Sequence, residues 1–250
     1  MSQFKIHGET DVGQVRDTNE DCVDWYLSKD SDSALAVVAD GVGGFAGGEI
    51  ASRLAIEHTC ETICKTINED SQSWDAESAR MVWRVMDAVA DANQAIFSVR
   101  SKNAEIGRMG TTLVMALAHG DNLCIAHVGD SRCYRFRDRV LQQLTLDHSM
   151  AQELCGTGIV GKNMAYRNVL TRTLGVERCV EPEVTMQHTE VNDIYLLCSD
   201  GLSSYIDDEM ISNILEQEDE LPETVSKLVS IANDAGGQDN ISVVLIQRIA

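Results

Sequence analysis

Acidic residues in this 250-residue chain stand at the ends of apolar segments that resemble buried strands. Asp40 closes one such segment, Asp130 and Asp200 follow two others, and Asp239 lies just before the last one. Because a sheet aligns the ends of its strands, these carboxylates can converge on one edge although they are far apart in sequence. Carboxylates that share a cleft raise one another's pKa unless cations lie between them, and oxygen ligands favour hard divalent cations. The pattern therefore predicts a metal-dependent hydrolase.

The composition narrows the possible partners. Acidic residues number 40 and basic residues 20, and the formal net charge of −20 argues against nucleic acid as a partner. This negative charge would also repel a phosphate substrate, unless bound cations or an arginine in the site make the potential positive locally. No apolar run has the length of a membrane span, and the N-terminus lacks a signal-peptide core, so we expect a cytoplasmic protein without a membrane partner.

The apolar patterning predicts blocks of strands and paired helices rather than strict alternation of the two. A glycine-rich turn at 41–48 separates the strand that ends at Asp40 from the first helix. Residues 147–175 are less periodic and form an excursion from the main core. This order favours an α+β plan with antiparallel sheets covered by helices. We expect helices at 49–68, 76–102, 207–217 and 222–234, and strands at 4–10, 23–27, 35–39, 111–118, 123–128, 132–137, 140–144, 184–188, 194–198 and 241–249.

Eight short motifs in a fixed order carry a family resemblance. They are Thr-Asp-Val-Gly-Gln-Val-Arg-Asp-Thr-Asn-Glu-Asp at 10–21, Val-Ala-Asp-Gly-Val-Gly-Gly at 38–44, Met-Gly-Thr-Thr at 109–112, His-Val-Gly-Asp-Ser-Arg at 127–132, Leu-Thr-Leu-Asp-His-Ser at 144–149, Val-Leu-Thr-Arg-Thr-Leu-Gly at 169–175, Cys-Ser-Asp-Gly-Leu at 198–202 and Gly-Gln-Asp-Asn-Ile-Ser-Val at 237–243. Each alone is weak. Together they resemble the PP2C (PPM) family of metal-dependent protein serine/threonine phosphatases, especially its bacterial members.

The resemblance implies a role for each acidic residue. Asp40 would bridge two Mn²⁺ or Mg²⁺ ions, and the Gly41 carbonyl would bind one of them. Asp200 and Asp239 would ligate the first ion, and Asp21, with Glu20 beside it, would hold the second. Asp130 would share a third, weaker ion with Asp200. Arg16 would grip the substrate phosphate, for which a planar, two-pronged donor is well suited.

The resemblance also implies a fold and a reaction. The fold would be a central antiparallel β-sandwich flanked by helix pairs on both faces, formed by residues 1–250 as a single domain, with the excursion at 147–175 containing a flap. A hydroxide that bridges the two ions would attack phosphoserine or phosphothreonine in proteins. We expect a monomer that opposes a serine/threonine kinase. The alternative is a catalytically silent relative that acts as a regulatory binding module.

One position departs from the family pattern. Many bacterial members have a histidine where this chain has Phe45, and eukaryotic members have one where this chain has Val42. The proton donor for the leaving alkoxide therefore cannot be assigned from the resemblance. Water held by the metal ions and His148 are the two candidates, although a lone histidine is more often a structural hydrogen-bonding group.

Other interpretations of the same residues are weaker. Asp-Gly after a strand is often only a turn, and the glycine-rich loop at 41–48 lacks the Lys-Ser/Thr ending of a nucleotide-binding loop. Cys133 and Arg139 have the Cys-x5-Arg spacing of cysteine-dependent phosphatases, but the segment alternates as a half-exposed strand does. We expect Arg132 to anchor the structure near Asp130. The eight cysteines are scattered, which favours buried, reduced thiols over a zinc site.

Overall fold

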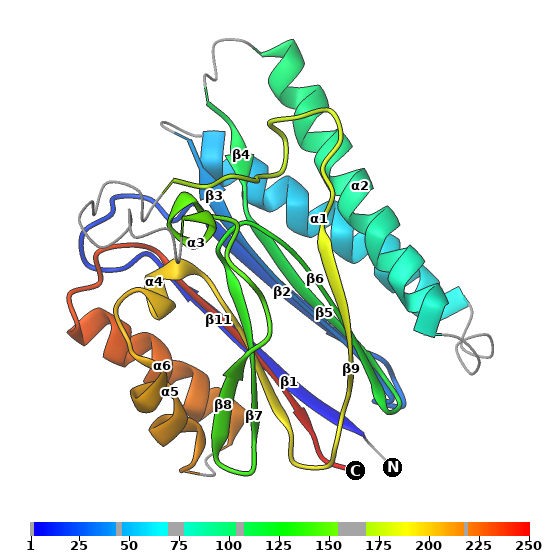
Figure 1. Ribbon diagram of the computed structural model, residues 1–250, viewed down its shortest axis with the longest axis vertical. Helices are drawn as coiled ribbons and strands as arrows, with labels where there is room; N and C mark the ends of the chain where they lie inside the picture. Colours follow the sequence, from blue (N-terminus) through cyan, green and yellow to red (C-terminus); the bar gives the residue numbers. More distant parts are fainter. Residues whose placement is uncertain (1–2, 44–46, 70–77, 104–107, 155–168, 218–219) are drawn as a thin grey trace.

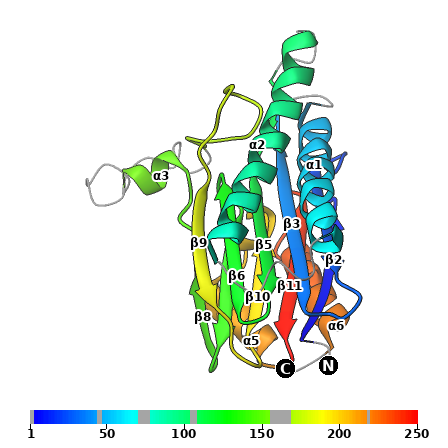
Figure 2. The same ribbon diagram turned by 90° about the vertical axis from the view of Figure 1, so that its right-hand side faces the viewer.

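The computed structural model describes residues 3–43, 47–69, 78–103, 108–154, 169–217 and 220–250. Two antiparallel sheets form the centre of the molecule, and helices cover the outer face of each (Figures 1 and 2). Strands of the first sheet are, in spatial order, β1 (Phe4–Asp11), β11 (Ile241–Arg248), β10 (Ile194–Cys198), β7 (Arg132–Arg137) and β8 (Val140–Gln143). Strands of the second sheet are β2 (Asp21–Leu27), β3 (Ser33–Val42), β5 (Leu113–His119), β6 (Asn122–Val128) and β9 (Glu183–His188), with β4 (Gly110–Thr111) paired to the end of β3.

Two helix pairs enclose the sheets. The helices are α1 (Gly47–Glu69), α2 (Ser78–Lys102), α3 (Met150–Glu153), α4 (Asp200–Ser203), α5 (Asp208–Leu215) and α6 (Leu221–Asp234). Helices α1 and α2 pack on the sheet that contains β3, and helices α5 and α6 pack on the sheet that contains β11 (Figure 1). Two short helices, α3 and α4, lie near the end that carries the strand-end acids. None of the helices in the described part of the chain is both long and apolar enough to cross a membrane.

Three apolar layers result from the alternation of side chains along the strands. On β3, Leu35 and Val37 pack against α1 and α2, whereas Ala36 and Val38 pack between the two sheets. On β11, Leu245 faces α5 and α6. Because both faces of these strands are covered, β3 and β11 read as continuous apolar segments rather than as alternating ones.

The predicted fold class is confirmed, and most predicted elements lie within a few residues of the observed ones. The predicted strand at 111–118 is wrong in one respect, because it is divided into β4 and β5 at Thr112. The reason is local, since the Thr112 amide donates to the Asp40 carbonyl and the Thr112 hydroxyl accepts from the Asp40 amide. The short helix α4 was also missed, and residues 155–168 of the predicted excursion lie outside the described residues.

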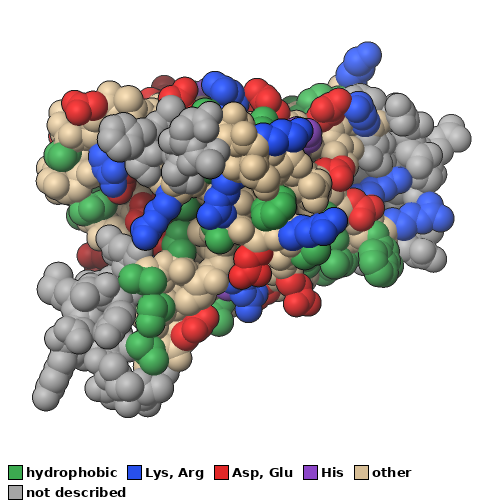
Figure 3. Space-filling view, turned by 90° about the horizontal axis from the view of Figure 1, so that it is seen from above, with side chains coloured by type: hydrophobic (Ala, Val, Ile, Leu, Met, Phe, Trp, Pro, Cys, Tyr) green, Lys and Arg blue, Asp and Glu red, His purple; other side chains and the backbone are tan. Residues whose placement is uncertain are grey.

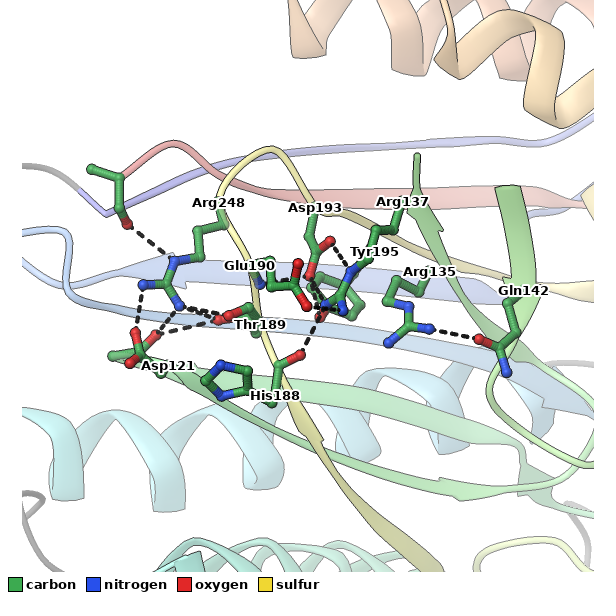
Figure 4. Close-up of polar contacts among 12 residues, drawn as sticks. Asp121, Arg135, Arg137, Gln142, His188, Thr189, Glu190, Asp193, Tyr195 and Arg248 are labelled. Atoms are coloured by element: carbon green, nitrogen blue, oxygen red, sulfur yellow. Dashed lines mark hydrogen bonds and ion pairs between the residues drawn. The ribbon is translucent and has the colours of Figure 1, made fainter. Parts of the chain in front are cut away.

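Ion pairs at the opposite end of the sandwich join the two sheets where the chain passes from β9 to β10. Figure 4 shows Arg137 of β7 and Asp193 of the connection pointing toward each other. The Arg137 guanidinium donates to both Asp193 carboxylate oxygens at 2.6 Å, and the Tyr195 hydroxyl donates to the same carboxylate. Arg248 of β11 pairs with Asp121 and donates to the Thr189 carbonyl. These contacts fix the end of the molecule that lies away from the strand-end acids.

Candidate metal centre

The acidic side chains converge because strand alternation directs them between the sheets. Asp21 of β2 and Asp40 of β3 are directly opposite each other in the antiparallel register. Asp40 follows Ala36 and Val38 in the series that faces the other sheet. On the other sheet, Asp200 begins α4 two residues after the end of β10, and Asp239 lies two residues before β11. Two strand ends from each sheet therefore bring their carboxylates to one place.

A single cavity of about 250 Å³ lies between these residues. Its walls contain most of the predicted site: Arg16, Asp40, Gly41, Asp130, Asp200 and Asp239, together with Glu20, Val42, Gly43, Leu170 and Asn240. Asp21 is not in the wall, but its buried side chain is close enough to Asp40 to raise the pKa of that residue. The structure thus brings Arg16, Gly41 and the predicted acidic ligands together, and the acidic residues belong to one electrostatic cluster.

The carboxylates destabilise one another's charged forms. Burial, followed by repulsion from Asp21, Asp200, Asp130 and Asp239, raises the pKa of Asp40 well above its ordinary value. Burial and the charge of Asp200 raise the pKa of Asp130 to about 7. Such shifts arise when several acids share a site without a compensating cation. A bound dication would reverse this effect, because it stabilises the ionised carboxylates.

Asp21 gives an independent test of whether a metal ion fits here. Burial raises its pKa to about 7, although hydroxyl groups of Ser242 and Ser199 hydrogen-bond to it and oppose the shift. Its Oδ2 atom is buried and has no hydrogen-bond partner among the described residues. A buried oxygen without a donor is costly unless a cation or an ordered water reaches it. The donor set of carboxylate and carbonyl oxygens therefore fits Mn²⁺ or Mg²⁺.

Gly41 and Gly201 allow the backbone to close around the cavity. A Cβ atom on Gly41 would lie 2.4 Å from the Gly48 carbonyl oxygen and 2.5 Å from that of Glu20. On Gly201 a Cβ atom would lie 1.9 Å from the Asn240 carbonyl oxygen. A real Cβ atom cannot approach an oxygen so closely, so any other residue would move the strand ends that carry Asp40 and Asp200.

Arg16 reaches the cavity from the loop between β1 and β2. Its Nη2 atom donates to the Asp239 carboxylate at 2.7 Å, and about half of its side chain is exposed. The loop is held by Asn240, whose side-chain amide donates to the carbonyls of Val12 and Thr18 and accepts from the Glu20 amide. Asn240 is a positioning residue that the sequence analysis quoted only as part of a motif. Its place directly after Asp239 is its only local feature, and this does not reveal which loop it holds.

His148 has a structural position rather than a catalytic one. Its Nδ1 atom accepts from the Gly129 amide at 3.1 Å, and its ring stacks on His127 with centroids 4.5 Å apart. Burial and the neighbouring His127 lower its pKa to about 4. His148 does not line the cavity. The structure therefore supports a structural role for it, as a group that fixes the turn before Asp130, rather than a role as proton donor.

The same histidines lie beside Glu183 in a group with metal-ligand composition, but a hydrogen bond occupies one ring nitrogen of each. His127 donates Nε2–H to the Leu146 carbonyl at 2.8 Å. His148 Nδ1 accepts a hydrogen bond from the Gly129 amide. Its Nε2 atom lies 3.3 Å from Arg172 Nη1 and 3.6 Å from the Glu183 carboxylate. The positive guanidinium beside that nitrogen opposes a bound cation. We therefore assign this group to the framework behind Asp130.

Arg132 does anchor the structure near Asp130, and its partner is Asp147. The guanidinium donates to both carboxylate oxygens of Asp147, at 2.9 and 2.7 Å.

Cys133, next to Arg132, is fully buried in β7, and burial raises the pKa of its thiol, which excludes a thiolate nucleophile there. Cys155 and Phe45 lie outside the described residues. None of the seven described cysteines forms a disulfide with another described residue. Three of them are buried and three partly buried, but Cys179 is exposed, so the prediction of buried thiols is wrong for that residue.

A sandwich of this topology with an acidic cavity at one end defines a class of metal-dependent hydrolase, and the comparisons identify the family. The family model described as "Protein phosphatase 2C" matches residues 14–245. The chain is 34% identical to the serine/threonine phosphatase stp of Listeria monocytogenes, over 97% of this chain and 96% of the relative. It is 35% identical to PstP of Mycobacterium tuberculosis over 97% of this chain and 44% of that longer protein. The chain belongs to the protein phosphatase 2C family.

Solved structures agree with this assignment. The crystal structure of Mycobacterium tuberculosis PstP superimposes with a TM-score of 0.84 at 34% identity, covering 99% of this chain and 100% of the other. Stp1 from Staphylococcus aureus gives a TM-score of 0.86 at 29% identity, covering 100% and 98%. A structure of the PstP catalytic domain, with a TM-score of 0.82 at 35% identity and 99% coverage of both chains, contains two manganese ions.

Proposed function

We propose that this protein removes phosphate from phosphoserine and phosphothreonine in proteins, in a reaction that depends on Mn²⁺ or Mg²⁺. The observation that carries the proposal is the convergence of Asp40, Asp200 and Asp239 on one cavity that Arg16 also enters. Such a cavity binds hard cations, and cations with an arginine bind phosphate. Membership of the protein phosphatase 2C family and the name of the Listeria relative support the same substrate class.

The proposed division of roles follows the positions of the residues. Asp40 lies between the two sheets and would hold the ions together with Asp200, Asp239 and Asp21. Dications bound there would lower the pKa of water and offset the negative charge of the phosphate. Asp130, whose pKa responds to Asp200, would contribute to a third, weaker site. Gly41 lines the cavity, and its carbonyl would supply a further oxygen ligand.

Arg16 would bind the substrate phosphate through two parallel hydrogen bonds from its guanidinium. In the structure this group neutralises Asp239. Because about half of the side chain is exposed, it can turn toward a phosphate without breaking a buried contact. No histidine is present among the described residues that line the cavity, so we propose that water rather than a histidine protonates the leaving alkoxide.

Hydrolysis of p-nitrophenyl phosphate tests this function most directly. We expect turnover with Mn²⁺ or Mg²⁺, none with excess chelator, and a loss of at least about 10²-fold in kcat for Asp200→Asn. Asp87→Asn is the matched control, because Asp87 is exposed on α2 and the substitution removes the same charge. A phosphothreonine peptide should then be hydrolysed as well.

A silent regulatory module would give a different result. It would bind Mn²⁺, as measured by calorimetry, but hydrolyse neither substrate. The convergence of Asp40, Gly41, Asp130, Asp200 and Asp239 on one cavity supports the enzyme over the silent module.

The biological setting remains part of the proposal. We infer that residues 1–250 act as a single phosphatase domain, as a monomer in the cytoplasm, and oppose a serine/threonine kinase. Size-exclusion chromatography with light scattering tests the oligomeric state. Phosphoproteomics of a strain that lacks the protein tests the pathway, since loss of the enzyme should raise phosphorylation at a defined set of serine and threonine sites.

A further inference from the structure

A second groove opens beside the metal cavity and shares a wall with it. The groove has a volume of about 620 Å³. Val42, Gly43 and Leu170 line both spaces, so the groove begins where the cavity ends. A phosphorylated side chain that enters the cavity must leave its own backbone at this rim, and an extended chain advances about 3.3 Å per residue. The neighbours of the phosphorylated residue therefore reach the groove within two or three positions.

The groove has an apolar floor and walls. Val169 and Val176 expose 40% and 45% of their surface there, and Met109 lies beneath them. Two exposed valines beside a catalytic cavity are not needed for packing, since the core behind them is closed by Met109, which is 2% exposed. Exposed apolar side chains that gather next to a polar site are typical of surfaces that bind a partner.

The charged residues of the groove are both arginines, in a chain with 40 acidic and 20 basic residues. Arg100 is part of the wall, because its Nη1 atom donates to the carbonyls of Gly175 and Val176. Arg108 is exposed, and its side chain forms no hydrogen bond or ion pair with any described residue. Figure 3 shows basic and hydrophobic side chains side by side across this end of the molecule.

The backbone holds Arg108 at the boundary between the two spaces. Its carbonyl oxygen would be 2.2 Å from a Cβ atom on Gly43, which has a φ of 151°. Two residues later, Gly110 of β4 pairs with Val42 of β3. The Arg108 backbone is therefore fixed beside the cavity rim, which its own side chain can reach.

We propose that this groove binds the residues next to the phosphorylated serine or threonine, and that it selects segments with an apolar side chain for the valine-lined wall and an acidic side chain for Arg108. The inference rests on the proposed function, because it assumes that the phosphate of a protein substrate enters the metal cavity. The net charge of −20 would repel an acidic segment elsewhere on the surface. Arg108, which has no partner among the described residues, supplies positive charge at the rim where the substrate would lie.

The test compares matched phosphothreonine peptides that carry aspartate, serine or lysine two or three positions from the phosphothreonine. For the aspartate peptide we expect Arg108→Gln to lower kcat/KM about fivefold, mainly through KM, since an exposed ion pair contributes ground-state binding. The serine peptide should change less than about twofold. Arg108→Glu should reverse the order of the aspartate and lysine peptides, which loss of a merely structural contact would not do.

The apolar wall is tested in the same way. Val169→Ser and Val176→Ser should reduce the preference for leucine over serine next to the phosphothreonine by about threefold each, because each removes part of the buried apolar contact. Arg139→Gln and Val140→Ser are the controls, since both residues are exposed on the β7–β8 hairpin at the opposite end of the molecule. Neither should change the ratio between peptides.

Two further measurements separate the groove from the proposed function. All groove variants should hydrolyse p-nitrophenyl phosphate at wild-type rates, because this substrate has no flanking residues. If the wild-type protein hydrolyses neither substrate, the proposed function fails, and the anisotropy of a labelled peptide with a non-hydrolysable phosphonate still shows whether Arg108→Glu weakens binding. Unchanged peptide ratios and unchanged phosphonate binding in Arg108→Glu, with hydrolysis of p-nitrophenyl phosphate intact, would overturn the inference.

Discussion

Asp130 allows the loss in free energy of unfolding that the acidic cavity causes to be measured in the metal-free protein. Burial and the charge of Asp200 raise its pKa from 3.8 to about 7. The folded protein therefore keeps this proton to a higher pH than the unfolded chain does. Stability that is fully present below about pH 4 is lost as the pH rises to about 7, and the loss persists above that pH.

The magnitude follows from the shift. At about 1.36 kcal/mol per pKa unit, a change from 3.8 to about 7 corresponds to about 4 kcal/mol. Movement of the carboxylates and entry of water into the open cavity reduce this cost, and we expect about half of it, or about 2 kcal/mol. Asp130→Asn removes the charge with little change in shape. It should therefore stabilise the metal-free protein by about 2 kcal/mol at pH 8 and leave it unchanged near pH 4.

Urea unfolding in the presence of a chelator, followed by tryptophan fluorescence, measures this difference at both pH values. Asp87→Asn is the control for loss of a single exposed charge from the same acidic chain. Addition of Mn²⁺ should reverse the order of the two proteins at pH 8, because the wild type gains a ligand that the variant lacks. If Asp130→Asn stabilises the metal-free protein at pH 8 no more than Asp87→Asn does, the carboxylates do not repel one another as described.

Three further predictions concern the site and its framework. Arg16→Ala should lower kcat/KM for p-nitrophenyl phosphate by at least about tenfold, and Arg16→Lys should recover little of it, because an ammonium group cannot form the paired hydrogen bonds. Gly201→Ala should destabilise the protein by more than about 2 kcal/mol in urea unfolding, since its Cβ atom would lie 1.9 Å from the Asn240 carbonyl oxygen. Arg137→Ala should cost about 3 kcal/mol by leaving the buried Asp193 carboxylate without a cation, whereas Arg139→Ala, which breaks an exposed pair with Glu216, should cost less than about 1 kcal/mol.

The acidic cluster could be predicted from the sequence because each member stands at the end of an apolar strand. Asp40 follows an unbroken apolar segment, and strand ends must align in a sheet. Which face each carboxylate occupies could not be predicted, because β3 is buried on both sides and its sequence does not alternate. The family resemblance predicted the sandwich, but only the structure shows on which side of the sheet the carboxylates lie. Asp21 and Asp40 are opposite each other and point between the sheets.

Contacts between distant segments were beyond the sequence analysis. Nothing local indicates that Asn240 supports the loop of Arg16 from more than 200 positions away, as its hydrogen bonds to Val12 and Thr18 show. The same is true of His148, whose hydrogen bond to the Gly129 amide depends on the fold of the chain between them. A lone histidine in a motif has several chemical uses, and only its partners distinguish them.

The two ends of the sandwich have opposite electrostatic arrangements, and this difference has a thermodynamic consequence. At the end away from the cavity, the buried Asp193 carboxylate has the Arg137 guanidinium and the Tyr195 hydroxyl as donors. At the cavity, burial and mutual repulsion raise the pKa of Asp40, and a buried oxygen of Asp21 has no described donor. Because the fold is held at one end by paired charges, it can keep unpaired carboxylates at the other. The free energy that those carboxylates cost the metal-free protein is recovered when a dication binds, so it becomes part of the metal affinity.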